Sequence, residues 1–227
     1  MNVNNDKILY KGILAVYVVL ILTIAIPATT VLAASPGYLT IKRAIVSSGA
    51  LDALLQTNGN IPKDGSGGAF GYGIMTKAGD NAVIVATTND NMRDSTTQGS
   101  GSGPIWHNNF ARLAVVPGGL CGSDKQITAI TFEQPGIVSV KGSQVSIASV
   151  PSSFTGTDSI TGNPLTISPG NNVQKVVSFV LDPKPSIQDL KAVCVKNMTP
   201  AEQVIQRGAD TTGSGLSLGG SNSGDIS

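Results

Sequence analysis

Short runs of apolar residues, spaced about ten residues apart, dominate the chain from residue 70 onward and alternate with clusters of Gly, Pro, Asn and Asp. In residues 144–150 (QVSIASV), apolar side chains alternate with serines, as in a strand that buries one face. This rhythm is typical of a β-sandwich or barrel. We therefore expect strands over residues 38–46, 70–76, 82–88, 110–116, 126–132, 137–141, 144–150, 174–181 and 189–195.

The connections between these runs favour antiparallel pairing. Residues 77–81 (KAGDN) and 141–143 (KGS) each join two strong strands and are typical of hairpin loops. No long helical pattern separates the strands, as a parallel α/β sheet would require. The sequence thus predicts an all-β protein, an antiparallel β-sandwich of about eight or nine strands.

Two short helices are expected in addition. Residues 199–202 (TPAE) form a capping box with proline at the first helical position, which predicts a short C-terminal helix over residues 200–207. The pair Ser47-Ser48 precedes an apolar run and predicts a second helix over residues 49–57.

Residues 208–227 are mostly Gly, Ser and Thr. They carry too little apolar surface to offset the entropy lost on ordering. We expect them to form a flexible Gly/Ser tail after a β-sandwich domain over residues 34–207.

The N-terminus has a different pattern. A basic lead with Lys7 and Lys11 precedes an uncharged apolar run and then small residues up to Ala34. A basic region, an apolar core and small residues at the cleavage site are the three parts of an export signal. We therefore predict a signal peptide over residues 1–33, cleaved between Ala33 and Ala34.

Two other interpretations of this segment stay open. The uncharged stretch 12–34 is long enough to span a bilayer as an uncleaved N-terminal membrane anchor, with the domain outside. The residues Lys11-Gly12 followed by ILAV also resemble the processing site of type IV pilin-like proteins. That resemblance covers residues 7–26 and implies an apolar helix at a filament core, although Tyr17 stands where a glutamate is expected.

Charge excludes two classes of partner. The precursor has 15 basic and 14 acidic residues, and residues 1–33 contain two Lys and one Asp, so 13 of each sign remain. Duplex binding needs a basic surplus, and binding to anionic lipid needs a Lys/Arg cluster. We expect no nucleic-acid partner and membrane contact only through the N-terminal segment.

Cys121 and Cys194 are the only cysteines, and both lie in the expected mature chain. In an oxidising compartment two such thiols are expected to pair. Closing a loop of 73 residues (194 − 121) lowers the entropy of the unfolded chain and stabilises the fold by about 4 kcal/mol. The pair therefore predicts a disulfide bond and an extracellular protein.

Few residues suggest chemistry. His107 is the only histidine; it and its neighbours Trp106 and Asn108 are candidates for a binding site, against a structural role in the loop. The side-chain oxygens of Asn89, Asp90, Asn91 and Asp94 suit Ca²⁺, so these residues are a candidate calcium site. The alternative is an ordinary solvated loop, in which Asn and Asp are also common. Asn197 begins a glycosylation sequon whose use is left open.

The sequence has no catalytic set. It contains only two glutamates, Glu133 and Glu202, and no phosphate-binding loop, so we expect neither an enzyme nor a bound cofactor other than Ca²⁺. The predicted function is structural or binding, in a secreted or cell-surface protein whose loops 89–109 and 151–172 contact an unknown extracellular or surface ligand. The alternatives are a membrane-tethered or pilin-like envelope subunit and a secreted hydrolase that uses His107.

Overall fold

A computed structural model describes residues 35–47, 51–63, 67–76, 81–87, 106–186 and 189–208, with only the backbone of residues 81–87. These residues belong to one compact unit that begins at Ser35. Their regular structure is one 3-10 turn, η1 (Gly37–Leu39), and strands β1 (Ile41–Ser47), β2 (Ala53–Thr57), β3 (Phe70–Thr76), β4 (Asn81–Thr87), β5 (Trp106–Ala114), β6 (Lys125–Ile130), β7 (Ile137–Lys141), β8 (Gln144–Ala148), β9 (Phe154–Thr157), β10 (Pro164–Ile167), β11 (Val173–Pro185), β12 (Leu190–Pro200) and β13 (Val204–Arg207). The predicted all-β class is confirmed.

One sheet has five strands in the order β13-β1-β2-β8-β7. Its neighbours are antiparallel except β1 and β13, which run parallel. The alternation expected for β8 is observed, because Val145 and Ile147 are buried and Gln144 is exposed. The predicted hairpin between β7 and β8 is also present, and Gly142 takes the positive φ (58°) that a tight hairpin turn requires.

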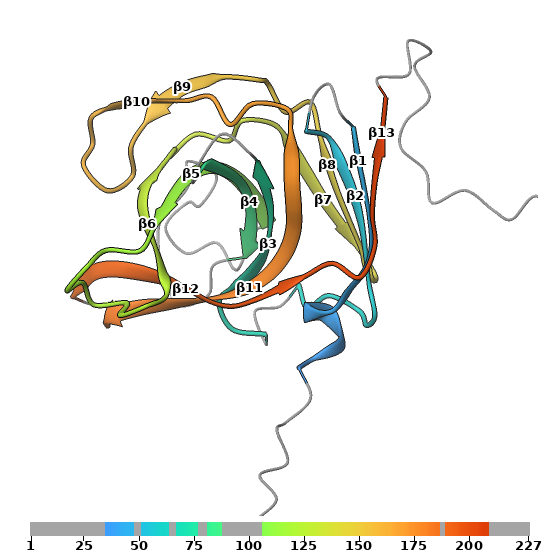
Figure 1. Cartoon of the computed structure of the whole chain (residues 1–227), viewed down its shortest axis with the longest axis horizontal. Coiled ribbons are helices and arrows are strands. Elements are labelled where there is room, and N and C mark those ends of the chain that lie inside the picture. Colours follow the sequence, from blue (N-terminus) through green and yellow to red (C-terminus); the bar gives the residue numbers. More distant parts are fainter. Residues whose placement is uncertain are drawn as a thin grey trace, which may run out of the picture. The chain divides into compact units, whose positions relative to one another are not determined.

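The other large sheet closes on itself as a six-stranded antiparallel barrel in the order β11-β12-β6-β5-β4-β3 (Figure 1). The thirteen-residue β11 makes closure possible, because its first part pairs with β3 and its second part with β12. Phe179 lies opposite Gly71 in this register, so a bulky ring faces a position without a side chain. One buried cluster comes from the barrel strands alone and fills the lumen: Met75, Ala111, Leu113, Ile127, Ile130, Val177, Phe179, Leu181 and Val195.

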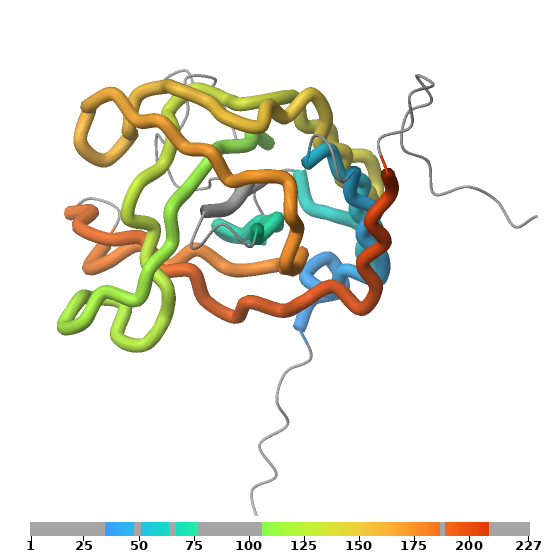
Figure 2. The backbone as a smooth tube through the Cα atoms, turned by 45° about the horizontal axis from the view of Figure 1, so that its top comes forward, coloured from blue at the N-terminus to red at the C-terminus, as the bar shows by residue number. Residues whose placement is uncertain are grey.

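The five-stranded sheet packs on the outer wall of the barrel. Phe70, Tyr72 and Phe110 from the barrel share one buried cluster with Leu55 and Ile147 from the five-stranded sheet. The backbone path in Figure 2 shows β1 and β2 beside the barrel wall. The face-to-face packing of a sandwich is therefore present, with one of its two sheets curled into a barrel.

The predicted C-terminal helix over residues 200–207 is wrong. Pro200 ends β12, and Val204–Arg207 form β13 at the edge of the five-stranded sheet. The backbone between them is bonded to other strands, since Glu202 N donates to Ile41 O and Ala44 N donates to Gln203 O. Pairing with β1 thus overrides the local preference of the capping box.

The predicted helix over residues 49–57 is also wrong, since Ala53–Thr57 form β2 in the middle of the five-stranded sheet. Four of its five residues are buried, including the consecutive Ala53, Leu54 and Leu55. A strand buried on both faces has a continuous apolar run, which periodicity does not distinguish from a helix.

Each of the nine expected strands overlaps an observed one, but β9 and β10 were not expected. They form a hairpin in which Phe154 pairs with Ile167. This hairpin falls within residues 151–172, which the sequence predicted to be a binding loop. β9 (FTGT) contains Thr and Gly and shows no clear apolar alternation, and the alternation of Leu165 and Ile167 in β10 covers only four residues and begins with a proline.

The lumen cluster predicts a large loss of stability for Phe179→Ala. Phe179 is 2% exposed, and removing its ring leaves a cavity, so the free energy of unfolding should fall by about 3–5 kcal/mol. Denaturant unfolding measures this difference. The control Ile160→Ala, at a side chain that is 56% exposed, should change stability by less than about 1 kcal/mol. Equal effects of the two substitutions would contradict a packed lumen.

Candidate functional site

The start of β5 carries the residues that the sequence singled out, Trp106, His107 and Asn108, followed by Asn109. They belong to a strand paired with β4, and not to a loop as expected for residues 89–109. Successive side chains of a strand point to opposite faces. Phe110 belongs to the cluster between the sheets, which places Trp106 and Asn108 on that face and His107 and Asn109 toward the lumen.

Trp106 is part of an aromatic cluster at the inter-sheet core. Its ring stacks on that of Tyr72, with 5.9 Å between the ring centroids, and meets the ring of Phe70 edge-on at a centroid distance of 5.4 Å. The centroids of the Phe70 and Tyr38 rings are 4.7 Å apart. The Tyr72 hydroxyl donates to Tyr38 O at 2.7 Å. Burial, with a smaller contribution from Tyr38, raises the pKa of Tyr72, so its hydroxyl stays protonated. The indole therefore contributes to packing on both of its neighbours and is only half-buried.

Asn108 and Asn109 are both fully buried, but their hydrogen bonding differs. Asn109 Nδ2 donates to Thr131 O at 2.5 Å. Among the described residues, neither Oδ1 nor Nδ2 of Asn108 has a hydrogen-bond partner, and the same holds for Trp106 Nε1. A buried amide without partners costs about 1–3 kcal/mol. Burial of the Asn108 amide therefore costs free energy that no hydrogen bond in the described fold offsets.

Gly136 makes room for the Asn108 side chain. A Cβ placed on Gly136 would lie 3.1 Å from Asn108 Nδ2 and 2.8 Å from Ala148 O. The approach to Ala148 O is too close for a methyl group without displacement of the backbone, and the approach to Asn108 Nδ2 would require that side chain to move. The glycine before β7 therefore allows β5 and β7 to approach each other at this point.

His107 is completely buried on the lumen side of β5, where its backbone pairs with Ala86. Burial at 0% separates its ring from any substrate in solution. Among the described residues, no group of three His, Cys, Asp or Glu side chains lies close enough together to hold a metal ion.

Four carboxylates hold turns and strand ends. Asp52 accepts from Val150 N, and Asp158 accepts from Ile130 N and Ile160 N. Glu133 accepts from Thr157 N at 2.6 Å and from Thr157 Oγ1 at 2.9 Å, and the backbone bond lowers the pKa of Glu133. Asp182 binds Lys196 at 2.7 Å and Lys184 at 3.0 Å.

The hydrogen bond from Lys196, followed by the hydrogen bond and charge of Lys184, lowers the pKa of Asp182 and keeps its carboxylate ionised. Asp182 lies on β11 and Lys196 on β12, so the pair joins the two strands. These contacts stabilise the scaffold. They balance the negative charge of Asp182 with two lysines.

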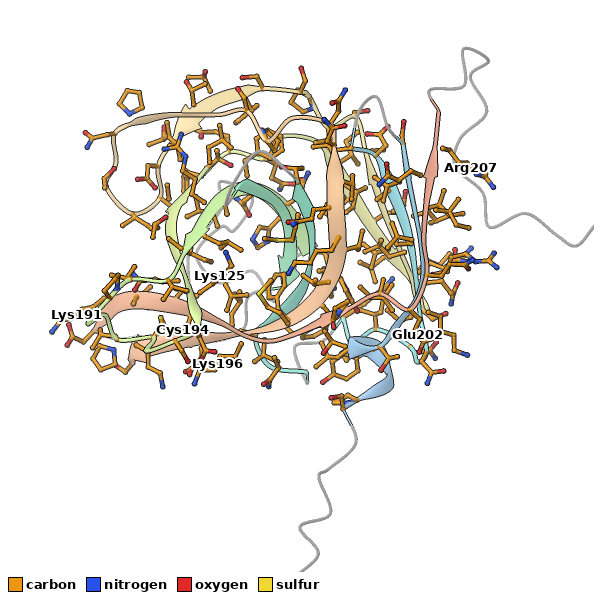
Figure 3. The ribbon with its side chains drawn as sticks, viewed as in Figure 1. Lys125, Lys191, Cys194, Lys196, Glu202 and Arg207 are labelled. Atoms are coloured by element: carbon orange, nitrogen blue, oxygen red, sulfur yellow. A yellow bond between two sulfur atoms is a disulfide. The ribbon has the colours of Figure 1, made fainter. Side chains whose placement is uncertain are left out.

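The predicted disulfide between Cys121 and Cys194 is present, with Cα atoms 5.4 Å apart. It joins the segment between β5 and β6 to β12. Cys194 is fully buried, and its position on β12 is labelled in Figure 3. A disulfide is compatible with an extracellular location. No helix within the described residues is both long and apolar enough to cross a membrane.

Several predicted site residues lie outside the described part of the chain. These are the cleavage-site residues and the calcium candidates, namely Ala33, Ala34, Asn89, Asp90, Asn91 and Asp94. Asn197 of the glycosylation sequon lies in β12, exposed and with a positive φ of 52°. Asparagine tolerates this conformation better than most residues, and it occurs where the register between β11 and β12 shifts.

The hairpin β9–β10, in the predicted binding loop 151–172, is well braced. Thr155 and Thr166 share a hydrogen bond at 2.8 Å across the strands, and Ser168 donates to Ser153 at 2.6 Å. Glu133 additionally bonds Thr157 from the neighbouring chain segment.

Comparison of the chain with protein-family models, curated proteins and solved structures gave no match to any of them.

The two asparagines predict opposite responses to the same substitution. Asn108→Leu removes an amide without partners, so the free energy of unfolding should stay constant or rise. Asn109→Leu removes the bond to Thr131 O and should lower it by about 1–3 kcal/mol. Denaturant unfolding of both variants tests this. A similar loss in both would show that Asn108 has a polar partner in solution.

The lowered pKa values of Glu133 and Asp182 predict acid sensitivity. Because each folded-state pKa lies below the unfolded one, their contribution is present above pH ~5 and is lost as the pH falls through the folded values. Glu133→Gln should therefore be less stable than the parent at neutral pH, and the difference should shrink toward pH ~2. Thermal melts across this range test it, with Glu202→Gln at an exposed site as the control. A difference independent of pH would contradict the assignment.

Proposed function

We propose that this chain is an exported structural protein of the cell surface and is not an enzyme. The single observation that carries the proposal is the Cys121–Cys194 bridge, which forms within the barrel scaffold. Disulfides form and persist in oxidising compartments and are rare in the cytosol, so the bridge supports an extracellular location. The apolar N-terminal segment with its basic lead supports the same location.

The use of the polar residues supports a structural role. The carboxylates of Asp52, Glu133, Asp158 and Asp182 bind backbone groups or lysines of the scaffold. His107, the sole histidine of the chain, is fully buried. Among the described residues we find no observation that favours the hydrolase alternative.

The proposal predicts that the protein purified from its own cells without reductant contains no free thiol. Intact mass after alkylation under denaturing conditions should show no added label, and reduction beforehand should add two labels, one for each cysteine. Terminal sequencing should give Ala34 as the first residue, as cleavage after Ala33 requires.

Two alkylatable thiols in the unreduced protein would contradict export to an oxidising compartment. A first residue at Ile13 would favour the pilin-like alternative, and an intact N-terminus would favour the anchored form. In either case the barrel would remain outside the cell, but it would stay attached to the membrane or filament.

A further inference from the structure

The five-stranded sheet has two open edges, β7 and β13, on its opposite sides. Within the described residues β7 pairs only with β8, and β13 pairs only with β1. An open edge presents backbone N–H and C=O groups that can pair with another chain. Neither strand contains a proline or a bulge, which are two devices that protect natural edges.

We propose that β7 of one copy pairs with β13 of a second copy, so that the sheet continues from copy to copy. This inference rests on the proposed structural function and names its partner. Since β1 and β13 are parallel and β2, β8 and β7 alternate in direction, β7 runs opposite to β13. A second copy in the same orientation, displaced across the sheet, therefore brings two antiparallel edges together.

The backbone of β7 offers two residues for this pairing. Lys141 and Gln144 flank a two-residue turn and form a hydrogen-bonded pair, so Ser139 and Ile137 also bond to β8. The N–H and C=O groups of Val138 and Val140 consequently point away from β8. No backbone bond of these two valines to another segment is found in the described residues.

The backbone of β13 offers a matching pair. Ala44 N donates to Gln203 O, and Ala44 lies opposite Val204 in the parallel register. Alternation along the strand then directs the N–H and C=O groups of Val204 and Gln206 away from β1. Each edge strand thus has two residues, spaced by two positions, whose backbone N–H and C=O groups can bond to the edge strand of a second copy.

Matching these groups fixes the register between the copies. Val140 lies opposite Val204 of the second copy, and Val138 lies opposite Gln206. Ser139 then lies opposite Ile205 on the outer face, next to Ile137, which is 65% exposed. The same face of the sheet stays outward in both copies, because the register keeps the side-chain alternation in phase.

The charges at the two edges are complementary in this register. Glu202 N donates to Ile41 O, Ile41 pairs with Thr57, and Thr57 N donates to Ser143 O in the turn after Lys141. Glu202 and Lys141 therefore lie near the same ends of the strands but at opposite edges of the sheet. Displacement across the sheet brings Lys141 beside Glu202 of the next copy.

Both side chains are available for this contact. Lys141 and Glu202 are exposed, and neither forms an ion pair within the described part of the chain. Figure 3 shows Glu202 where the chain passes from β12 into β13, with Arg207 at the far end of β13. Arg207 then lies opposite the start of β7, at the other end of the contact.

A contact between two different edges does not close on itself, so it generates an open-ended assembly. Contact through one strand per copy is smaller than the area of about 1,000 Å² that stable interfaces exceed. We therefore expect weak association, visible at high protein concentration.

Charge exchange tests this arrangement. Sedimentation velocity of the oxidised protein should show association that increases with concentration. Lys141→Glu alone and Glu202→Lys alone should each weaken it about threefold to tenfold, because each places like charges at the contact. A mixture of the two variants should recover the parental association, since opposite charges then alternate. Lys191→Glu, at an exposed lysine of β12 far from Glu202 and Arg207 (Figure 3), is the matched control and should leave association unchanged.

Cross-linking tests the register. Ser139→Cys protein mixed with Ile205→Cys protein should form mixed dimers with a short bismaleimide, and the native disulfide should remain intact. Either protein alone should give little product. Dimers of Ser139→Cys alone would show pairing of β7 with β7 and would overturn the proposal.

A protein that stays monomeric at every concentration would also overturn it. Failure of this assembly and failure of the proposed function are distinguishable. A monomer without free thiols and with Ala34 at its N-terminus would leave the exported structural role in place. Two free thiols would remove that role whatever the state of association.

Discussion

Closure of the barrel depends on β11, because this strand is long enough to pair with β3 along its first part and with β12 along its second. The other barrel strands are shorter, with between six and eleven residues. With closure, no barrel strand presents an edge, and the lumen side chains are enclosed. The same strand supplies Val176 to the inter-sheet cluster and Phe179 to the lumen cluster, so both cores depend on its register.

The local pattern of the sequence predicted those parts of the fold that are determined locally. Alternation marked β8, the predicted range 137–141 coincides with β7, and the loop at Gly142 marked the hairpin between them. β2 was mistaken for a helix because residues on both of its faces are buried, which makes its apolar run continuous. β13 was mistaken for a helix because its pairing with β1 joins residues 160 positions apart, which no local signal reports.

The candidate site was predicted less well than the fold. The sequence drew attention to Trp106, His107 and Asn108 as rare or polar residues, but a polar run with one tryptophan is typical of a loop. The burial of His107 and Asn108 depends on the packing around β5, including the approach of Gly136 to Asn108, which only the folded arrangement creates. The difference between Asn108 and Asn109 likewise depends on which face of one strand each occupies.

The parallel pairing of β1 with β13 has a mechanical consequence. These are the first and last strands of the described domain, so tension on the chain at its two ends acts directly on them. Because they run in the same direction, the start of β1 and the end of β13 lie at opposite ends of the pair. Pulling them apart slides one strand along the other and loads the hydrogen bonds from Ala44 to Ser47 together, where antiparallel terminal strands would open one bond at a time. The domain is thus arranged to resist stretching along the line that joins its neighbours in the chain.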